Sequence, residues 1–196
     1  MKTKKFQGIV QVQYEQARQS IQTGDLLFCS GTYLISELIK KASNSFMSHV
    51  AFLFEWNGRV LVFESVESAG VRIIPLSHYV TNYNNTGRKY KGALYLARHE
   101  TLIDSSFDRT LLQNMIGKAI GSLNRNYDQT ELIRILTRIS LGVGRHKENE
   151  AYICSEFVDQ CFRQIGIRFP RTEAGFVYPE HIAADPHVYP MFEIVP

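Results

Sequence analysis

The chain of 196 residues has only three cysteines, Cys29, Cys154 and Cys161. A small, odd number of thiols excludes a disulfide-stabilised scaffold and is typical of a reducing compartment. No uninterrupted apolar run reaches 18 residues, which excludes a transmembrane helix. Polar residues interrupt the segment after the N-terminal lysines, so a signal peptide is not recognised and we expect a cytoplasmic protein.

The sequence also has little excess of positive over negative charge and no usual metal-ligand spacing. The formal net charge is +3 and no dense Lys/Arg block occurs, so we expect no nucleic-acid partner. The spacing between Cys154 and Cys161 matches no usual zinc pattern, and the sequence His-Glu-x-x-His is missing. We therefore expect neither a metal nor a cofactor.

The composition that is present is that of an ordinary globular protein. The apolar fraction is 44% and the charged fraction is 21%. A folded chain of this length buries roughly 70% of its unfolded surface, which is enough for a proper core. We therefore expect residues 1–196 to form a single domain.

The expected strands gather in the first half of the chain and most expected helices lie outside that region. The expected strands cover residues 25–29, 49–56, 59–66, 71–76 and 93–98. The expected helices cover residues 10–22, 32–42, 106–123, 129–140 and 152–165. Five prolines after residue 166 predict a mostly extended tail with one terminal strand. This order indicates the α+β class.

The clearest local signal is the pair Asn57-Gly58 between two apolar segments. Such a pair predicts a two-residue hairpin with a type I′ turn, because both positions need a positive φ angle. In this register Trp56 lies opposite Arg59, and side chains at alternate positions share one face of the hairpin. The turn therefore predicts which residues of the two strands are neighbours.

In this register His49 and Glu64 are diagonal neighbours on one face, within reach of a bridging hydrogen bond. A carboxylate beside an imidazole fixes its tautomer and raises its pKa. Glu67 would face the other way, although a slip of one residue would reverse this choice. The alternative interpretation is a surface ion pair of a histidine at the start of a strand.

Cys154 is expected in the first turn of the helix predicted for residues 152–165. Unpaired backbone N–H groups and the positive end of the helix dipole favour a thiolate there. Cys161 falls almost on the same helix face and is interpreted as a core residue, with Cys154 at the exposed end of that face. Cys29 ends an apolar strand and is also interpreted as core. For Cys154 the alternative interpretation is a small buried hydrophobe.

Several short motifs together resemble the circularly permuted branch of the NlpC-type papain-like family. They are Gly-Asp-Leu-Leu-Phe at 24–28, Ser-His-Val-Ala at 48–51, Val-Phe-Glu-Ser at 62–65, Ile-Cys-Ser-Glu-Phe-Val at 153–158 and Tyr-Pro-Glu-His-Ile at 178–182. In unpermuted relatives the cysteine helix precedes the histidine strand, whereas here it follows. The resemblance runs from about residue 23 to residue 185 and implies a small, barrel-like antiparallel sheet with the cysteine helix packed against it.

The resemblance also implies Cys154, His49 and Glu64 as a catalytic triad, the same three residues that the local patterns single out. It implies a cysteine hydrolase that cleaves an amide bond through an acyl-enzyme on Cys154. The implied substrate is a peptide, a cell-wall stem peptide or an N-acyl amide, which includes lipid-linked amides. The segment at about 105–146 matches no fixed motif and is interpreted as a helical insertion that shapes the pocket.

Two other functions stay open at this point. The first is a lipid acyltransferase or thioesterase of the lecithin:retinol type. It is supported by the helix predicted within residues 129–141, which has an apolar stripe on one face and arginines on another. This pattern is typical of a helix that lies on lipid. The second is a non-catalytic binding module with the same fold. Such a module would not need a reactive thiol at Cys154.

Overall fold

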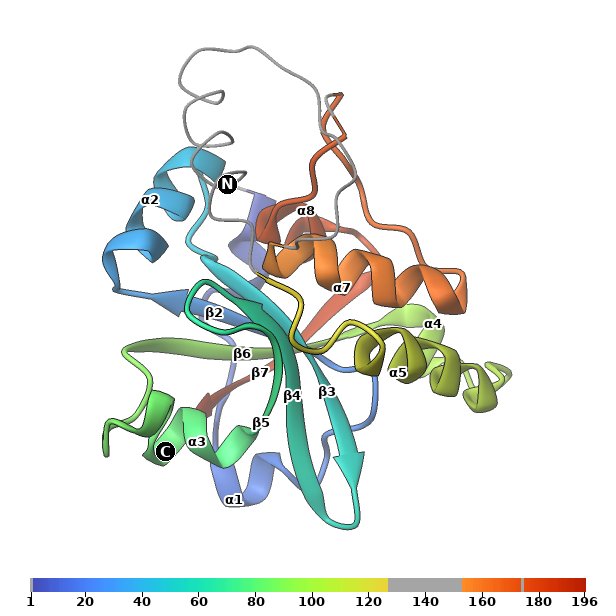
Figure 1. Cartoon of the computed structure of the whole chain (residues 1–196), viewed down its shortest axis with the longest axis horizontal. Coiled ribbons are helices and arrows are strands. Elements are labelled where there is room, and N and C mark those ends of the chain that lie inside the picture. The colour runs from blue at the N-terminus through green and yellow to red at the C-terminus, as the bar shows by residue number, and fades with distance from the viewer. Residues whose placement is uncertain (1, 127–152, 174) are drawn as a thin grey trace.

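The computed structural model describes residues 2–126, 153–173 and 175–196, and its centre is a seven-stranded sheet (Figure 1). The strand order is β1-β7-β6-β2-β3-β4-β5. The strands are β1 (Gln11–Gln13), β2 (Leu26–Gly31), β3 (His49–Trp56), β4 (Arg59–Val66), β5 (Gly70–Pro75), β6 (Gly92–His99) and β7 (Val188–Val195). Neighbouring strands are antiparallel except for the parallel pair of β1 and β7. The predicted α+β class with an antiparallel sheet is confirmed.

Helices surround this sheet. The α-helices are α1 (Tyr14–Ala17), α2 (Leu34–Ser43), α3 (Leu76–Thr81), α4 (Glu100–Ile103), α5 (Leu112–Ile120), α7 (Cys154–Phe162) and α8 (Pro179–Ala184). The 3-10 turns are η1 (Lys2–Phe6), η2 (Tyr83–Asn85), η3 (Arg109–Leu111) and η4 (Arg163–Ile165). None of the helices within the described ranges combines the length and the apolar character that crossing a membrane requires. The helix predicted for 129–140 lies outside the described residues.

Both faces of the central strands are buried. Along β2, Leu26 and Phe28 point into one core, whereas Leu27 and Cys29 point into a second core on the opposite face. The first core is completed by α5, α7 and α8, and the second by α1 and α3. Because both faces are covered, these strands are nearly continuous apolar runs instead of alternating ones.

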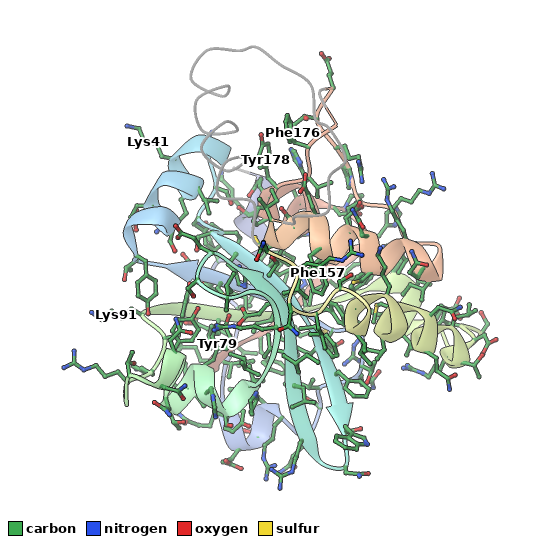
Figure 2. All side chains as sticks on the ribbon, in the orientation of Figure 1. Lys41, Tyr79, Lys91, Phe157, Phe176 and Tyr178 are labelled. Carbon is green, nitrogen blue, oxygen red and sulfur yellow. The ribbon has the colours of Figure 1, made fainter. Side chains whose placement is uncertain are left out.

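The cysteine helix α7 packs on the hairpin of β3 and β4 through aromatic rings. Phe157 lies on α7 on the side of the hairpin (Figure 2). It stacks on Phe52 with ring centroids 5.9 Å apart, and Phe52 stacks on Phe63 at 5.0 Å. Phe162, at the end of the helix, contacts Phe52 edge-on at 6.1 Å. These contacts hold the start of α7, where Cys154 lies, against the strands that carry His49 and Glu64.

The predicted hairpin is confirmed in its ends and in its register. Trp56 pairs with Arg59, and the turn residues Asn57 and Gly58 have φ angles of 50° and 72°. The strand predictions for β2, β5 and β6 and the helix predictions for α2, α5 and α7 agree with the observed elements to within a few residues, apart from the predicted helix start at 106, which lies before η3 and α5.

Two other predictions are wrong. Residues 10–22 form no long helix but the strand β1 followed by the single turn α1, because Gln11–Gln13 pair with a strand near the opposite end of the chain. The tail contains the predicted terminal strand, β7, but also the helix α8, which was not predicted. Pro179 opens that helix, a position where its missing N–H costs no hydrogen bond.

The ring contacts of α7 predict a stability effect. Phe157→Ala removes a fully buried ring between the helix and the hairpin, and it should lower the free energy of unfolding by about 3–5 kcal/mol. Urea unfolding followed by circular dichroism measures this. Trp56→Ala is the control, because this ring at the hairpin tip is 59% exposed and its loss should change stability by only about 0.5 kcal/mol. Equal effects of the two changes would contradict the assigned packing.

Candidate active site

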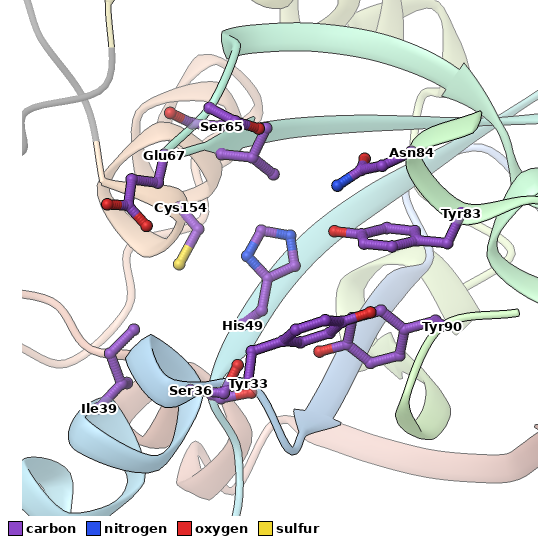
Figure 3. Close-up of a pocket in the computed structure, with 13 residues that line it drawn as sticks. Tyr33, Ser36, Ile39, His49, Ser65, Glu67, Tyr83, Asn84, Tyr90 and Cys154 are labelled. Atoms are coloured by element: carbon purple, nitrogen blue, oxygen red, sulfur yellow. The ribbon is translucent and has the colours of Figure 1, made fainter. Parts of the chain in front are cut away.

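A pocket of about 280 Å³ lies where the start of α7 meets β3, the end of β4 and α2 (Figure 3). Cys154 and His49 line it side by side, together with several serines and three tyrosines. Figure 3 shows the Cys154 side chain beside the His49 ring. The pocket thus gives a ligand direct access to a thiol and an imidazole.

The structure brings the three residues predicted as a triad together. His49 Nε2 lies 2.9 Å from Glu64 Oε2, as the hairpin register predicts. A second hydrogen bond joins the His49 ring to Cys154. Because Glu64 occupies Nε2, Nδ1 is the ring nitrogen that faces the thiol. Cys154 and Glu64 are 3% and 0% exposed, and Cys154 lines the pocket.

Glu64 is held by two further residues that the sequence did not reveal. Arg72 lies directly opposite Glu64 on β5 and donates from Nε to Oε1 at 2.8 Å. The Tyr79 hydroxyl, from α3, donates to Oε2 at 2.6 Å. His49 and Tyr79 therefore share one carboxylate oxygen, while Arg72 neutralises the other. These bonds satisfy a carboxylate that is completely removed from water.

This arrangement fixes the charge states. Burial alone would lower the pKa of His49, but the charges and hydrogen bonds of Cys154 and Glu64 outweigh it and raise the pKa to about 10. Burial alone would raise the pKa of Glu64, but His49, Arg72 and Tyr79 hold that pKa below its usual value. The site therefore favours an imidazolium next to a carboxylate over the whole neutral range.

The other two cysteines lie in the core, as predicted. Burial raises the pKa of the Cys29 and Cys161 thiols, so both stay protonated at neutral pH. Glu67, the weaker candidate for the histidine partner, lines the pocket, while Glu64 makes the bond to His49. The site thus distinguishes Cys154 from the other thiols and Glu64 from Glu67.

The sequence patterns did not identify the residues that bind Glu64 or the tyrosines that line the pocket. The wall tyrosines are Tyr33, Tyr83 and Tyr90. Arg72 could have been found by aligning the third strand with the second, but the turn at 67–69 carries no strong register signal. The tyrosines come from three segments that only the fold brings together.

The fold is similar to that of a solved structure. It is titled the crystal structure of metalloprotein YiiX from Escherichia coli O157:H7, and it matches with a TM-score of 0.64 and 18% identity. The match covers 89% of this chain and 98% of that chain. Within residues 2–126, 153–173 and 175–196, no group of three or more His, Cys, Asp or Glu side chains is arranged to hold a metal ion.

The sequence matches a family model over most of its length. No curated protein matches the chain. The family model covers residues 20–180 and is described as the permuted papain-like amidase enzyme, YaeF/YiiX, C92 family. The order of the elements, with the histidine strand before the cysteine helix, agrees with a permuted papain-like fold. The chain therefore belongs to the permuted papain-like amidase family, YaeF/YiiX, C92.

Proposed function

We propose that this protein is a cysteine amidase that hydrolyses a peptide or N-acyl amide through an acyl-enzyme on Cys154. His49 is the proton carrier and Glu64 the residue that orients it. The observation that carries this proposal is the buried hydrogen-bonded series from Glu64 to His49 to Cys154 at the pocket. Membership in an amidase family supports the class of reaction.

In the first step the Cys154 thiolate attacks the amide carbon and forms a carbon–sulfur bond. The negative charge moves to the carbonyl oxygen, where the backbone N–H of Cys154 at the start of α7 supplies one hydrogen bond. The His49 imidazolium then gives its proton to the amide nitrogen as the carbon–nitrogen bond breaks. An amine leaves, and the acyl group stays on Cys154 as a thioester.

In the second step the neutral His49 takes a proton from water, and the hydroxide attacks the thioester carbon. The carbon–sulfur bond breaks, the acid is released and the thiolate–imidazolium pair is restored. Throughout the cycle Glu64 keeps the Nε2 proton of His49 in place, so that Nδ1 alone exchanges protons with the reacting groups.

The lipid acyltransferase alternative depends on residues 129–141, which lie outside the described residues. The described pocket, at about 280 Å³, is just below the usual range for ligand sites and is lined by polar serines as well as rings. These features fit a small amide better than a long acyl chain. Acyl transfer to an added amine or alcohol that outruns hydrolysis would favour the alternative instead.

Thiol reactivity is the first test. We expect iodoacetamide to alkylate Cys154 about tenfold or more faster than Cys29 and Cys161 at neutral pH, because Cys154 lines the pocket beside His49 whereas those two lie in the core. His49→Ala should slow labelling at Cys154, and Cys154→Ala should abolish amide hydrolysis. Peptide mass spectrometry of timed samples measures each rate. Labelling in urea, where all three thiols are accessible, gives the reference rates, and equal folded rates would count against an activated nucleophile.

The role of Glu64 predicts a pH effect. Its negative charge raises the pKa of His49, so Glu64→Gln should lower that pKa and move the alkaline loss of the imidazolium from about pH 10 to lower pH. We expect kcat/KM to fall by about 10²- to 10⁴-fold. Nitrogen NMR of the labelled imidazole follows the titration without substrate. Glu67→Gln is the matched control for the titration, and a His49 midpoint that is the same in Glu64→Gln and wild type would refute this role.

Arg72 predicts an effect at acid pH. A carboxylate with a lowered pKa stabilises the fold above its unfolded pKa and loses this contribution as pH falls through the folded pKa. Arg72→Met should raise the pKa of Glu64, so both kcat/KM and stability should decline at higher pH than in wild type. Arg72→Lys keeps the charge, so the decline of kcat/KM and stability at acid pH (the acid limb of each pH profile) should stay near its wild-type position. Identical acid limbs in wild type and Arg72→Met would show that Arg72 does not hold Glu64 ionised.

A further inference from the structure

Three tyrosine rings form a wall of the pocket beside the cysteine and histidine. Tyr33 precedes α2, Tyr83 begins η2, and Tyr90 precedes β6. Their ring centroids are 5.6 Å apart for Tyr33 and Tyr90, 6.3 Å for Tyr33 and Tyr83, and 4.9 Å for Tyr83 and Tyr90. Figure 3 shows this tyrosine wall on the side of His49 away from Cys154.

The hydroxyl groups of the tyrosine wall already have partners inside the protein. Tyr33 Oη accepts from the backbone N–H of Lys91 at 3.4 Å. The Tyr90 hydroxyl is hydrogen-bonded to serine side chains and the Tyr83 hydroxyl to Tyr79. Burial raises the pKa of Tyr83 and Tyr90, so these rings stay uncharged. What the wall offers a ligand is therefore neutral ring surface.

The wall is held in place by the residues that support Glu64. Tyr79 packs against Tyr83 at 4.8 Å and against Tyr90 at 5.3 Å, and its hydroxyl binds Glu64. The Arg72 guanidinium lies 5.9 Å from the centre of the Tyr83 ring. A wall fixed in this way loses little conformational entropy when a ligand binds.

Asn84 adds a polar group next to this surface. Its backbone has φ 53° and ψ 33°, a left-handed conformation that asparagine tolerates better than most residues. Its side chain lines the pocket, and within the part of the chain that the structure describes it forms no hydrogen bond with another residue. The amide therefore offers both donors and an acceptor to a bound molecule.

On the basis of the proposed function, we propose that the tyrosine wall and Asn84 form a substrate subsite. It binds an uncharged aromatic ring carried by the amide substrate, with Asn84 hydrogen-bonding to a polar group on that ring. Aromatic rings pack on one another offset or edge-on, and the neutral wall disfavours charged groups. The size of the pocket fits one ring and its linking amide.

Reagents that alkylate Cys154 test the subsite without knowledge of the substrate. N-benzyl iodoacetamide carries the ring, N-cyclohexylmethyl iodoacetamide carries a saturated ring of similar size, and iodoacetamide carries none. In each reaction the thiolate displaces iodide and forms a thioether. Saturation kinetics on the full chain should give N-benzyl iodoacetamide an advantage over the cyclohexyl reagent of about threefold to tenfold.

Variants locate the source of this advantage. Tyr83→Leu should abolish the preference for benzyl, measured as a ratio to iodoacetamide so that any change in Cys154 reactivity cancels. Tyr33→Leu repeats the test if Tyr83→Leu does not fold, because Tyr33 is 39% exposed. Tyr189→Leu, on the exposed face of β7, is the control and should keep the wild-type ratio.

Asn84 is tested by a polar substituent on the ring. N-(4-hydroxybenzyl) iodoacetamide should react with higher affinity than the benzyl reagent, and Asn84→Gly, which keeps the left-handed backbone, should remove this difference. Equal rates with benzyl and cyclohexylmethyl reagents, or an unchanged ratio in both tyrosine variants, would overturn the subsite. A Cys154 that does not react with iodoacetamide would instead refute the proposed function, so the two failures are distinguishable.

Discussion

The completely buried carboxylate of Glu64 is the constraint on which the rest of the site depends. Removing an ionised carboxylate from water costs several kcal/mol, and the fold recovers this only if both oxygens are fully bonded. His49, Arg72 and Tyr79 provide these bonds from β3, β5 and α3. All three partners must therefore be in place at the same time. The bonding of Glu64 thus requires both the correct register of β3, β4 and β5 and the correct position of α3.

Part of this requirement is visible in the sequence because it is local. Asn57 and Gly58 determine the turn, the turn determines the register of β3 and β4, and the register places His49 beside Glu64. Cys154 is also visible, since the start of a helix follows from nearby residues. These inferences need no knowledge of how distant segments meet, and for that reason the hairpin and the helix agree with the structure.

The remainder depends on contacts between segments far apart in the chain. The local pattern predicts a helix at residues 11–13, because the strand that pairs with them, β7, begins only at Val188 and cannot be recognised from nearby residues. Arg72 has no visible role until β5 is aligned with β4, and the intervening turn leaves that alignment open. The tyrosine wall is harder still to predict, because its three residues become neighbours only after α2, η2 and β6 have packed.

Tyr79 connects Glu64 with the tyrosine wall. Its hydroxyl binds the carboxylate that orients His49, and its ring packs against the tyrosine wall. A displacement of the wall would therefore be transmitted to Glu64, and a change at Glu64 would be transmitted to the wall. In the proposed subsite, a ligand that fits the wall would leave the imidazole in position, whereas one that forces the rings apart would disturb it. If both proposals hold, recognition of the ring and alignment of His49 depend on the same buried side chain, Tyr79.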